Sequence, residues 1–286
     1  MKQTNDAEAT RQVFHICTAY DREFVIPANV MMRSVVENTR SSIHFHLLVP
    51  RSQYIELGNQ FHPVNLDEKS FFSVYQIDEA LIEEHLKMNG VRHFSNAAIF
   101  RLFLSDILPD EIDKILYLDG DLVVNLDISK IFTSADKDIF SARIEESAPG
   151  FFNSGVFITS LNYWRKNDVV QRCLNFLKQN LESEMKDQIA LNHVFFAINQ
   201  PLDKQYNFPM SDFKLYGRKK DKNMIFHFTG SIKPWKRHAP LIFPVKLWRY
   251  FYKEIYKSEI LLINVRFWFI KRVIIWFSLF TRIKLR

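Results

Sequence analysis

The sequence predicts an α/β fold built on a doubly wound, mainly parallel sheet. Apolar segments alternate with helix-like segments through the first half of the 286-residue chain, as strands and helices do in such sheets. The apolar segments are largely continuous, which is typical of parallel strands buried on both faces. Two of them end directly at acidic residues, Asp21 and Asp119-Gly120-Asp121. Ligands of doubly wound sheets bind beyond the carboxyl ends of the strands, so these acids are candidates for a functional site.

The expected elements follow from the periodicity of the apolar residues. Four strands are expected in the first half, at 13–19, 43–49, 72–77 and 114–118. Helical spacing lies between them, at 25–36, 52–60, 79–87 and 96–108, the last with Ser95 as its N-cap. The second half predicts strands at 138–144, 155–160 and 224–228 and helices at 161–180 and 188–196.

The segment KILYLDGDLVV, residues 114–124, delivers two carboxylates one residue apart at the end of an apolar run. Burying an ionised carboxylate is costly unless a partner neutralises it. Gly120 would permit a sharp turn, so that both carboxylates converge on one point. A hard divalent cation, which prefers oxygen ligands, fits between them. A surface turn with two solvated acids is the alternative, but the apolar residues on both sides of the turn favour the metal.

The excess positive charge lies at one end of the chain. Residues 241–286 carry ten Lys or Arg and two Glu, whereas residues 1–240 carry 28 basic and 30 acidic side chains. Residues 1–240 are therefore nearly neutral, and the net charge of +6 comes from the basic segment 241–286. We expect one large domain over 1–240 and a basic, aromatic C-terminal segment over 241–286 that meets an anionic surface.

The N-terminus and the cysteines indicate the compartment. Residues 1–12 are polar and lack the apolar core of a signal peptide, and no stretch reaches 18 consecutive apolar residues. Cys17 and Cys173 lie in apolar surroundings, so we expect reduced, buried thiols. These observations predict a cytoplasmic protein.

Later segments contain groups that would complete a site for a metal and a phosphate. His227 could supply an imidazole nitrogen to the same cation, although a single histidine is more often a packed or a surface residue. Lys233 is a cation suited to a phosphate, and Gly230 would let the backbone approach a ligand. Arg101 could bind a phosphate or a carboxylate through its planar guanidinium, or form a surface ion pair.

Two further pairs of residues suit a sugar. Asn153 and Ser154 open an expected strand with neutral hydrogen-bonding groups of the kind that bind hydroxyls. Asp187 and Gln188 lie at an expected helix start, where the helix dipole alone also favours an acid. Together, the candidates predict a cation, diphosphate-binding side chains and hydroxyl-binding side chains in one protein.

With these segments in this order, the chain resembles glycosyltransferase family 8, the retaining enzymes that include glycogenin and the glucosyl- and galactosyltransferases of bacterial lipopolysaccharide cores. The resemblance covers residues 13–235 and depends on six ordered segments, of which Asp-x-Asp alone would be a weak signal. The segments are FHICTAYDREF, SNAAIFRLFLSDILP, KILYLDGDLVV, FFNSGVFITSLNYW, KDQIALN and HFTGSIKPWK. The resemblance implies a GT-A type, Rossmann-like fold and a UDP-linked hexose, glucose or galactose, as the donor.

The resemblance also implies roles for individual residues. The ligands of a Mn²⁺ or Mg²⁺ ion that holds the diphosphate would be Asp119, Asp121 and His227. The donor-binding positions would be Thr18, Ala19, Asp21 and Phe24 around the nucleotide, Gly120, Gly230 and Lys233 near the diphosphate, and Arg101, Asn153 and Ser154 around the sugar. The catalytic positions would be Asp187 and Gln188. Glu23 and Phe24 depart from the family pattern, which often has Asn and Tyr there.

The chemistry of the bond favours one mechanism. Breaking a sugar–phosphate bond leaves a diphosphate that gains negative charge, which a cation and Lys233 would stabilise most in the transition state. A neutral Gln188 is a poor nucleophile, so we expect front-face displacement with retention, in which its carbonyl oxygen supports the developing sugar cation. Asp187 as a nucleophile is the alternative.

The segment 241–286 holds twelve of the 42 aromatic residues of the chain and three of its five tryptophans. If 246–271 is one helix, a narrow arc of its surface carries Lys246, Lys253, Lys257, Asn264 and Lys271. A helix of this kind suits a membrane interface. For 246–256, packing on the domain is equally favoured, whereas for 260–286 we expect membrane contact. This predicts an enzyme peripheral to the inner face of the cytoplasmic membrane.

The expected acceptor is therefore a glycolipid, the core of lipopolysaccharide or lipooligosaccharide, or a related oligosaccharide. Two other functions stay open: a catalytically silent nucleotide-sugar-binding protein that docks on membranes, and a glycogenin-like transferase with a non-lipid acceptor. We expect no nucleic-acid partner, because a solvated nucleic-acid face would not need apolar runs such as 273–277.

Overall fold

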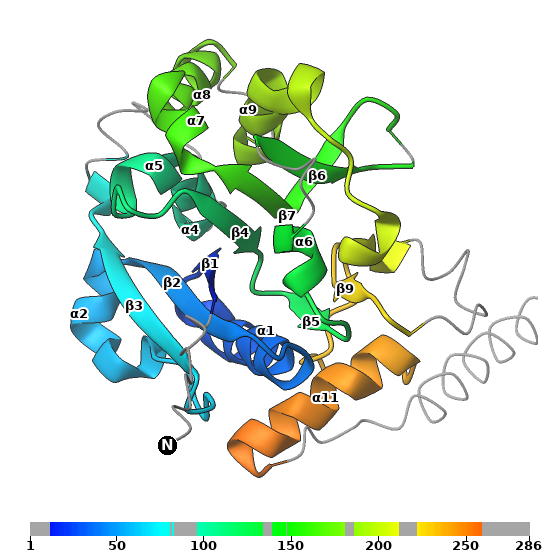
Figure 1. The fold of residues 1–286 in the computed structure, drawn as a ribbon. Coiled ribbons are helices and arrows are strands. Elements are labelled where there is room, and N and C mark those ends of the chain that lie inside the picture. The colour runs from blue at the N-terminus through cyan, green and yellow to red at the C-terminus, as the bar shows by residue number, and fades with distance from the viewer. Residues whose placement is uncertain are drawn as a thin grey trace, which may run out of the picture.

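A computed structural model describes residues 12–80, 82, 96–133, 139–146, 148–180, 186–211 and 222–258. A six-stranded sheet of order β3-β2-β1-β4-β7-β6 lies at its centre (Figure 1). Its strands are β1 Val13–Ala19, β2 Ser42–Pro50, β3 Ser70–Ile77, β4 Lys114–Leu118, β6 Phe140–Ile144 and β7 Phe152–Ser160. A three-stranded sheet of order β5-β9-β8 lies beside it, with β5 Leu122–Val124, β8 Phe208–Pro209 and β9 Ile225–His227.

The large sheet is mixed, with a parallel half and an antiparallel half. Strands β1, β2, β3 and β4 run parallel, whereas β7 pairs antiparallel with both β4 and β6. The expected mainly parallel, Rossmann-like α/β fold is therefore confirmed. The pattern of apolar residues in a buried strand does not indicate in which direction the strand runs. The antiparallel direction of β7 could therefore not be predicted from its own sequence. The short strands β5 and β8 were also not expected.

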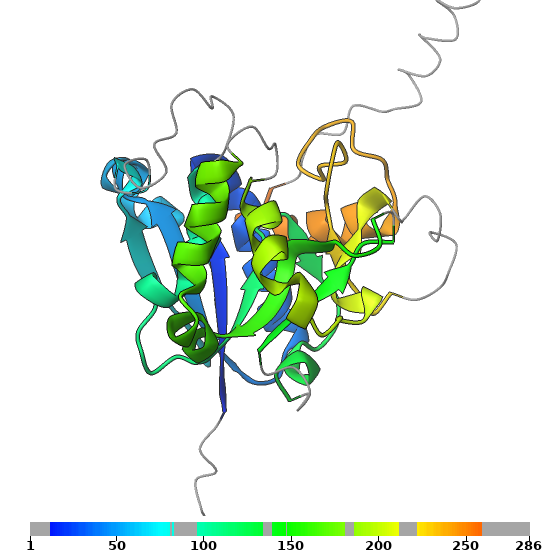
Figure 2. The same cartoon turned by 90° about the horizontal axis from the view of Figure 1, so that it is seen from above.

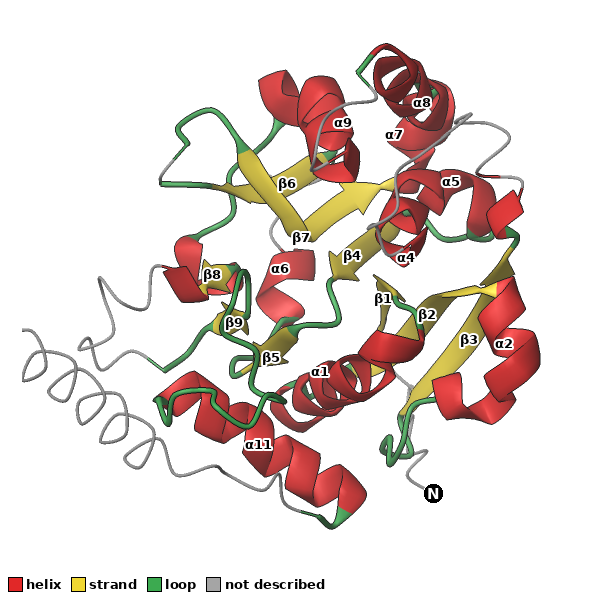
Figure 3. Cartoon of the chain, turned by 180° about the vertical axis from the view of Figure 1, so that it is seen from behind, coloured by secondary structure: helices red, strands yellow, loops and turns green. Residues whose placement is uncertain are grey.

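Helices cover both faces of the large sheet (Figures 2 and 3). The α-helices among the described residues are α1 Val25–Asn38, α2 Arg51–Leu57, α4 Asn96–Phe100, α5 Leu104–Ile107, α6 Ser129–Thr133, α7 Leu161–Lys166, α8 Val169–Gln179, α9 Lys186–Phe195 and α11 Phe243–Tyr256, of which α11 packs on the small sheet. Short 3₁₀ helices are η1 Arg22–Phe24, η2 Gly58–Phe61, η3 Arg101–Phe103, η4 Phe196–Ile198 and η5 Lys204–Tyr206.

Three helix predictions are wrong in their continuity. The expected helix 52–60 ends at Leu57, because Gly58 has a positive φ (49°) and begins the 3₁₀ helix η2. The expected helix 161–180 is two helices, because Asp168 has a left-handed backbone (φ 49°) that ends α-helical hydrogen bonding. The expected helix 96–108 contains the 3₁₀ turn η3 between α4 and α5. Its expected N-cap Ser95 and most of the expected helix 79–87 lie outside the described residues.

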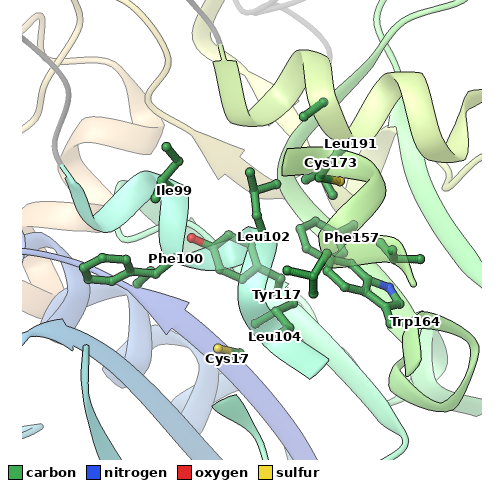
Figure 4. Close-up of a cluster of buried hydrophobic side chains, with 14 of the residues drawn as sticks. Cys17, Ile99, Phe100, Leu102, Leu104, Tyr117, Phe157, Trp164, Cys173 and Leu191 are labelled. Atoms are coloured by element: carbon green, nitrogen blue, oxygen red, sulfur yellow. The ribbon is translucent and has the colours of Figure 1, made fainter. Parts of the chain in front are cut away.

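Each face of the large sheet has its own hydrophobic core. One core joins the sheet to α4, α5, α7, α8 and α9 and includes Tyr117, Phe157 and Trp164 (Figure 4). The core on the other face joins the sheet to α1 and α6. Cys17 and Cys173 are free and buried in the first core, as expected.

The third core lies between the small sheet and α11. Trp248, Phe251 and Ile255 are buried there against Val123 of β5 and Phe226 of β9. Helix α11 lies alongside α1 in both views (Figures 1 and 3). For residues 246–256, the structure therefore shows packing on the body of the protein.

The helix α11 ends at Tyr256, because Lys257 has a left-handed backbone (φ 50°). The prediction of one helix over 246–271 is therefore wrong at this point. Residues 259–286, with Asn264 and Lys271, lie outside the described residues. Among the helices that the structure describes, none has the length and hydropathy needed to cross a membrane.

Candidate active site

The turn Asp119-Gly120-Asp121 joins the large sheet to the small one. At the end of β4, the backbone N–H of Asp119 donates to the carbonyl of Gly155 (2.8 Å). Beyond Asp121 the chain enters β5, where Leu122 pairs with His227 of the antiparallel strand β9. The N–H of Phe228 donates to the carbonyl of Asp121 (3.0 Å). This strand pairing places His227 beside both carboxylates.

The three side chains converge at donor-atom distances that suit one cation. His227 Nε2 lies 3.2 Å from Asp121 Oδ1 and 3.7 Å from Asp119 Oδ2. One donor atom of each residue lies within 4.8 Å of the other two. Two carboxylates and one imidazole form a donor set that fits Mn²⁺ or Mg²⁺ and leaves coordination positions for phosphate oxygens.

Gly155 of β7 makes this convergence possible. A Cβ atom at this position would lie 2.3 Å from His227 Cε1 and 2.5 Å from Asp119 Oδ2, so no other residue fits without displacing a donor. Gly120 is different, because its φ is not positive and a Cβ there would lie 3.5 Å from the Cβ of Ala28. The carboxylates therefore converge without any need for glycine between them, contrary to the expectation from the sequence.

Asn207 holds the His227 ring in place. Its Oδ1 lies 2.9 Å from His227 Nδ1, and its Nδ2 donates to Asn153 Oδ1 (3.0 Å). An amide oxygen accepts, so it selects the tautomer with the proton on Nδ1 and leaves the lone pair of Nε2 directed at the carboxylates. Asn153 thus supports the imidazole through Asn207.

Arg101 connects the acidic turn to the start of α9. Its guanidinium pairs with Asp119 (Nη1–Oδ1 3.0 Å) and with Asp187 (Nε–Oδ2 2.9 Å). It also donates to the carbonyl of Ser154 (2.9 Å). Burial opposes its charge, but Asp119 and Asp187 raise the pKa of Arg101 above its ordinary value. The ion pairs hold both carboxylates in fixed positions.

Gln188 is held by the backbone of β7. Its Oε1 accepts from the N–H of Ser154 (3.0 Å) and from Ser154 Oγ (3.3 Å). Gln188 and Asp187 are both buried in the first turn of α9. The two expected catalytic residues therefore lie in one network with Arg101 and Ser154.

Lys233 lies at the acidic turn. Its Nζ is 2.7 Å from Asp121 Oδ2 and 2.6 Å from the carbonyl oxygen of Phe228. Burial by itself raises the pKa of Asp121, but the protonated form of His227 and the ammonium group of Lys233 outweigh it and lower that pKa well below its usual range. Asp121 is therefore ionised at neutral pH. Gly230 has φ 70°, a backbone conformation that favours glycine.

The residues expected around a nucleotide lie at the end of β1. Thr18 is fully buried and its hydroxyl has no hydrogen-bond partner among the residues that the structure describes, so contact through its side chain would require rearrangement. Ala19 ends the strand, and Asp21 Oδ1 accepts from the N–H of Glu23 (3.0 Å). The ring of Phe24 meets that of Trp235 edge-on at 5.9 Å between centroids. This contact brings the residues that follow β1 against the loop that contains Lys233 and Trp235.

Reasoning from the sequence did not identify the roles of Gly155, Asn207 and Asn192. Asn192 accepts from the N–H of Phe152 (2.8 Å) and donates to its carbonyl (2.9 Å), which ties α9 to β7. Gly155 and Asn192 lie within two of the six segments that carry the family resemblance, but nothing in those segments indicated their structural roles. Asn207 lies in no such segment, and only the folded chain brings it to His227.

The fold is that of a GT-A type glycosyltransferase. The chain belongs to glycosyltransferase family 8: the family profile described as "Glycosyl transferase family 8" matches residues 15–239. It is 24% identical to a lipopolysaccharide 1,2-glucosyltransferase of Escherichia coli, over 79% of this chain and 74% of that protein. It is 26% identical to glycosyltransferase GlyF of Streptococcus pneumoniae, over 78% of this chain but only 58% of GlyF.

A solved structure has the same fold. The galactosyltransferase LgtC, crystallised with donor and acceptor sugar analogues, superposes with a TM-score of 0.68 at 19% identity. The match covers 86% of this chain and 97% of LgtC. Almost the whole LgtC fold therefore has a counterpart in this chain.

Proposed function

We propose that this protein is a metal-dependent, retaining hexosyltransferase that moves glucose or galactose from a UDP-sugar to a glycan acceptor. The observation that carries the proposal is the convergence of Asp119, Asp121 and His227 on one point. Mn²⁺ or Mg²⁺ held by these residues would supply positive charge to the diphosphate as it leaves.

The residues around that point have complementary tasks. Lys233 pairs with Asp121, and its ammonium group would exchange this contact for a diphosphate oxygen when the donor binds. Arg101 and Ser154, on the other side of Asp119, present donors near the expected position of the sugar. The charge that develops on the leaving group is thereby stabilised by groups already in place.

The bond changes of the proposed reaction balance within donor and acceptor. The bond between the anomeric carbon and the phosphate oxygen breaks, and its electron pair stays on the diphosphate. The acceptor hydroxyl attacks from the same face and its proton passes to the leaving phosphate oxygen, which retains the anomeric configuration. Gln188 would support the developing cation through its carbonyl oxygen.

The ion pair between Asp187 and Arg101 supports Gln188 over Asp187 in this role. A carboxylate bound by a buried guanidinium is a weaker nucleophile, because attack would remove its charge and deprive Arg101 of one of its two carboxylate partners. Asp187 is therefore proposed to position Arg101.

The acceptor is proposed to be a glycolipid at the inner face of the cytoplasmic membrane, of the lipopolysaccharide or lipooligosaccharide core type. Support comes from the basic, aromatic composition of 241–286 and from the name of the E. coli relative. Deleting 260–286 should release the protein from anionic phospholipid vesicles in a sedimentation assay. Unchanged sedimentation would contradict the membrane role and leave the transferase proposal intact.

A donor screen tests the transferase proposal. The purified chain is supplied with UDP-glucose, UDP-galactose and their N-acetyl forms in Mn²⁺, and released UDP is measured with and without acceptor. We expect one hexose donor to be cleaved only with metal. Donor binding with no turnover on any acceptor would favour a catalytically silent binding protein. Turnover on soluble glycans but not on glycolipids would favour a glycogenin-like transferase.

A further inference from the structure

Three histidines gather on one face of the central sheet, away from the acidic turn. His15 of β1 pairs in register with His44 of β2, and His46 follows two positions later on the same face as His44. His46 is fully buried, whereas His15 and His44 are half-buried. Strand geometry alone therefore brings three imidazoles together.

The ring nitrogens of the three histidines lie at spacings close to those of a metal site. His15 Nδ1 lies 3.0 Å from His46 Nε2, and one nitrogen from each ring lies within 4.8 Å of the others. In a tetrahedral site with metal–nitrogen bonds of about 2.0–2.1 Å, neighbouring nitrogens are about 3.3 Å apart. Side-chain shifts of a few tenths of an ångström to about 1.5 Å would bring the three ring nitrogens from their observed positions to the spacing of a tetrahedral metal site.

Hydrogen bonds from β3 orient two of the rings. Tyr75 Oη lies 3.1 Å from His46 Nδ1, and Ser73 Oγ lies 2.9 Å from His44 Nε2. Ligating histidines in proteins are commonly held by such a partner on the other nitrogen. When His46 Nδ1–H donates to Tyr75, the lone pair of His46 Nε2 faces His15, and a metal ion would replace the proton that His15 Nδ1 and His46 Nε2 share in their hydrogen bond.

The imidazoles are in the form that binds metals. Burial lowers the pKa of His15, and burial with the neighbouring imidazoles lowers that of His46 to about 3 and that of His44 to about 4. All three rings are therefore neutral at pH 7, with lone pairs present, and the group contains no carboxylate. A set of neutral nitrogen donors favours borderline ions such as Zn²⁺ over hard ions such as Mg²⁺.

We propose that His15, His44 and His46 form a second metal site, for Zn²⁺ or a similar borderline divalent cation, that fastens β1 to β2. It is separate from the Asp119/Asp121/His227 centre and independent of the proposed transferase reaction. His15 lies four positions before the end of β1 at Ala19, which is about 13 Å of strand. A water molecule would complete the coordination on the half-exposed side.

The test separates the two centres by mutation. Full-length protein carrying Asp121→Ala is freed of metal with a chelator and titrated with Zn²⁺ by calorimetry and with Co²⁺ by visible absorption. We expect one tight Zn²⁺ per chain, the strong absorption of four-coordinate Co²⁺, and a higher Tm with Zn²⁺. Adding His44→Gln or His15→Gln should weaken Zn²⁺ binding at least about 100-fold and abolish the Tm increase.

His62→Gln, in the same Asp121→Ala background, is the matched control, because His62 hydrogen-bonds Tyr54 and lies outside the cluster. It should leave Zn²⁺ binding unchanged. The proposal is overturned if folded Asp121→Ala protein, checked by circular dichroism, binds no Zn²⁺. It is equally overturned if His44→Gln and His15→Gln bind Zn²⁺ as tightly as the parent.

Discussion

His227 Nε2 lies 3.2 Å from Asp121 Oδ1, although 106 positions of chain separate these two residues. The distance depends on the pairing of β5 with β9, where Leu122 faces His227. That small sheet in turn packs on α11 through Val123, Phe226 and Trp248. Through the small sheet, the proposed metal ligands are therefore connected to α11, a helix that contains none of them.

Replacing Asp121 with alanine should nearly abolish transfer while the fold persists. The carboxylate faces both His227 and Lys233, so its loss removes one proposed metal ligand and the partner of the proposed diphosphate-binding ammonium. We expect turnover to fall by at least about 1,000-fold, with an unchanged circular dichroism spectrum. Transfer near the wild-type rate would refute the metal-centred mechanism.

Gly155→Ala should damage the metal site, whereas Gly120→Ala should be tolerated. The new methyl group at 155 would collide with His227 Cε1 (2.3 Å) and Asp119 Oδ2 (2.5 Å), but the one at 120 would make an ordinary contact with Ala28 (3.5 Å). We expect Mn²⁺ affinity, measured by calorimetry, to fall at least about 10-fold in Gly155→Ala. Equal Mn²⁺ affinities of the two variants would show that this steric argument fails.

Asn207→Ala should weaken Mn²⁺ binding by about 10–100-fold, because His227 loses the acceptor that sets its tautomer. Saturating Mn²⁺ should restore much of the turnover. Asn207→Asp keeps an acceptor oxygen at the same place and serves as the conservative comparison. If the alanine and aspartate variants bind Mn²⁺ alike, Asn207 does not orient the imidazole.

Trp248→Ala should lower the free energy of unfolding by about 3–5 kcal/mol, since the indole is fully buried against the small sheet. Urea denaturation measures this change. The neighbouring variant Tyr250→Ala removes a side chain that is 54% exposed and should change stability by less than about 0.5 kcal/mol. A Trp248→Ala midpoint equal to that of wild type would mean that α11 is not packed in solution.

Cys173 should resist alkylation in the folded protein. Burial raises its pKa from 9.0 to about 12, against a smaller opposing effect of Arg172. A raised pKa keeps the thiol protonated at pH 8.5, where an exposed cysteine is partly ionised and reactive. Mass spectrometry after iodoacetamide treatment should show little modification in native buffer and complete modification in urea. Rapid labelling of native Cys173 would contradict its burial.

The sequence by itself determined the class of fold and most of the residues that gather at the site. Strand and helix periodicity are local properties, so β1, β2 and β4 were predicted to within one residue at each end. The Asp119-Gly120-Asp121 turn was visible because carboxylates rarely follow a buried strand without a partner. The antiparallel direction of β7, the interruption at Asp168 and the end of α11 at Tyr256 were not predictable in this way.

The tertiary structure alone decided how the site is held. Nothing in the local sequence indicates that Asn207 contacts His227, or that Gly155 is required by two side chains from other strands. The same holds for the cluster of His15, His44 and His46, whose register exists only once β1 pairs with β2. Such contacts depend on which strands become neighbours, and packing over the whole chain selects those neighbours.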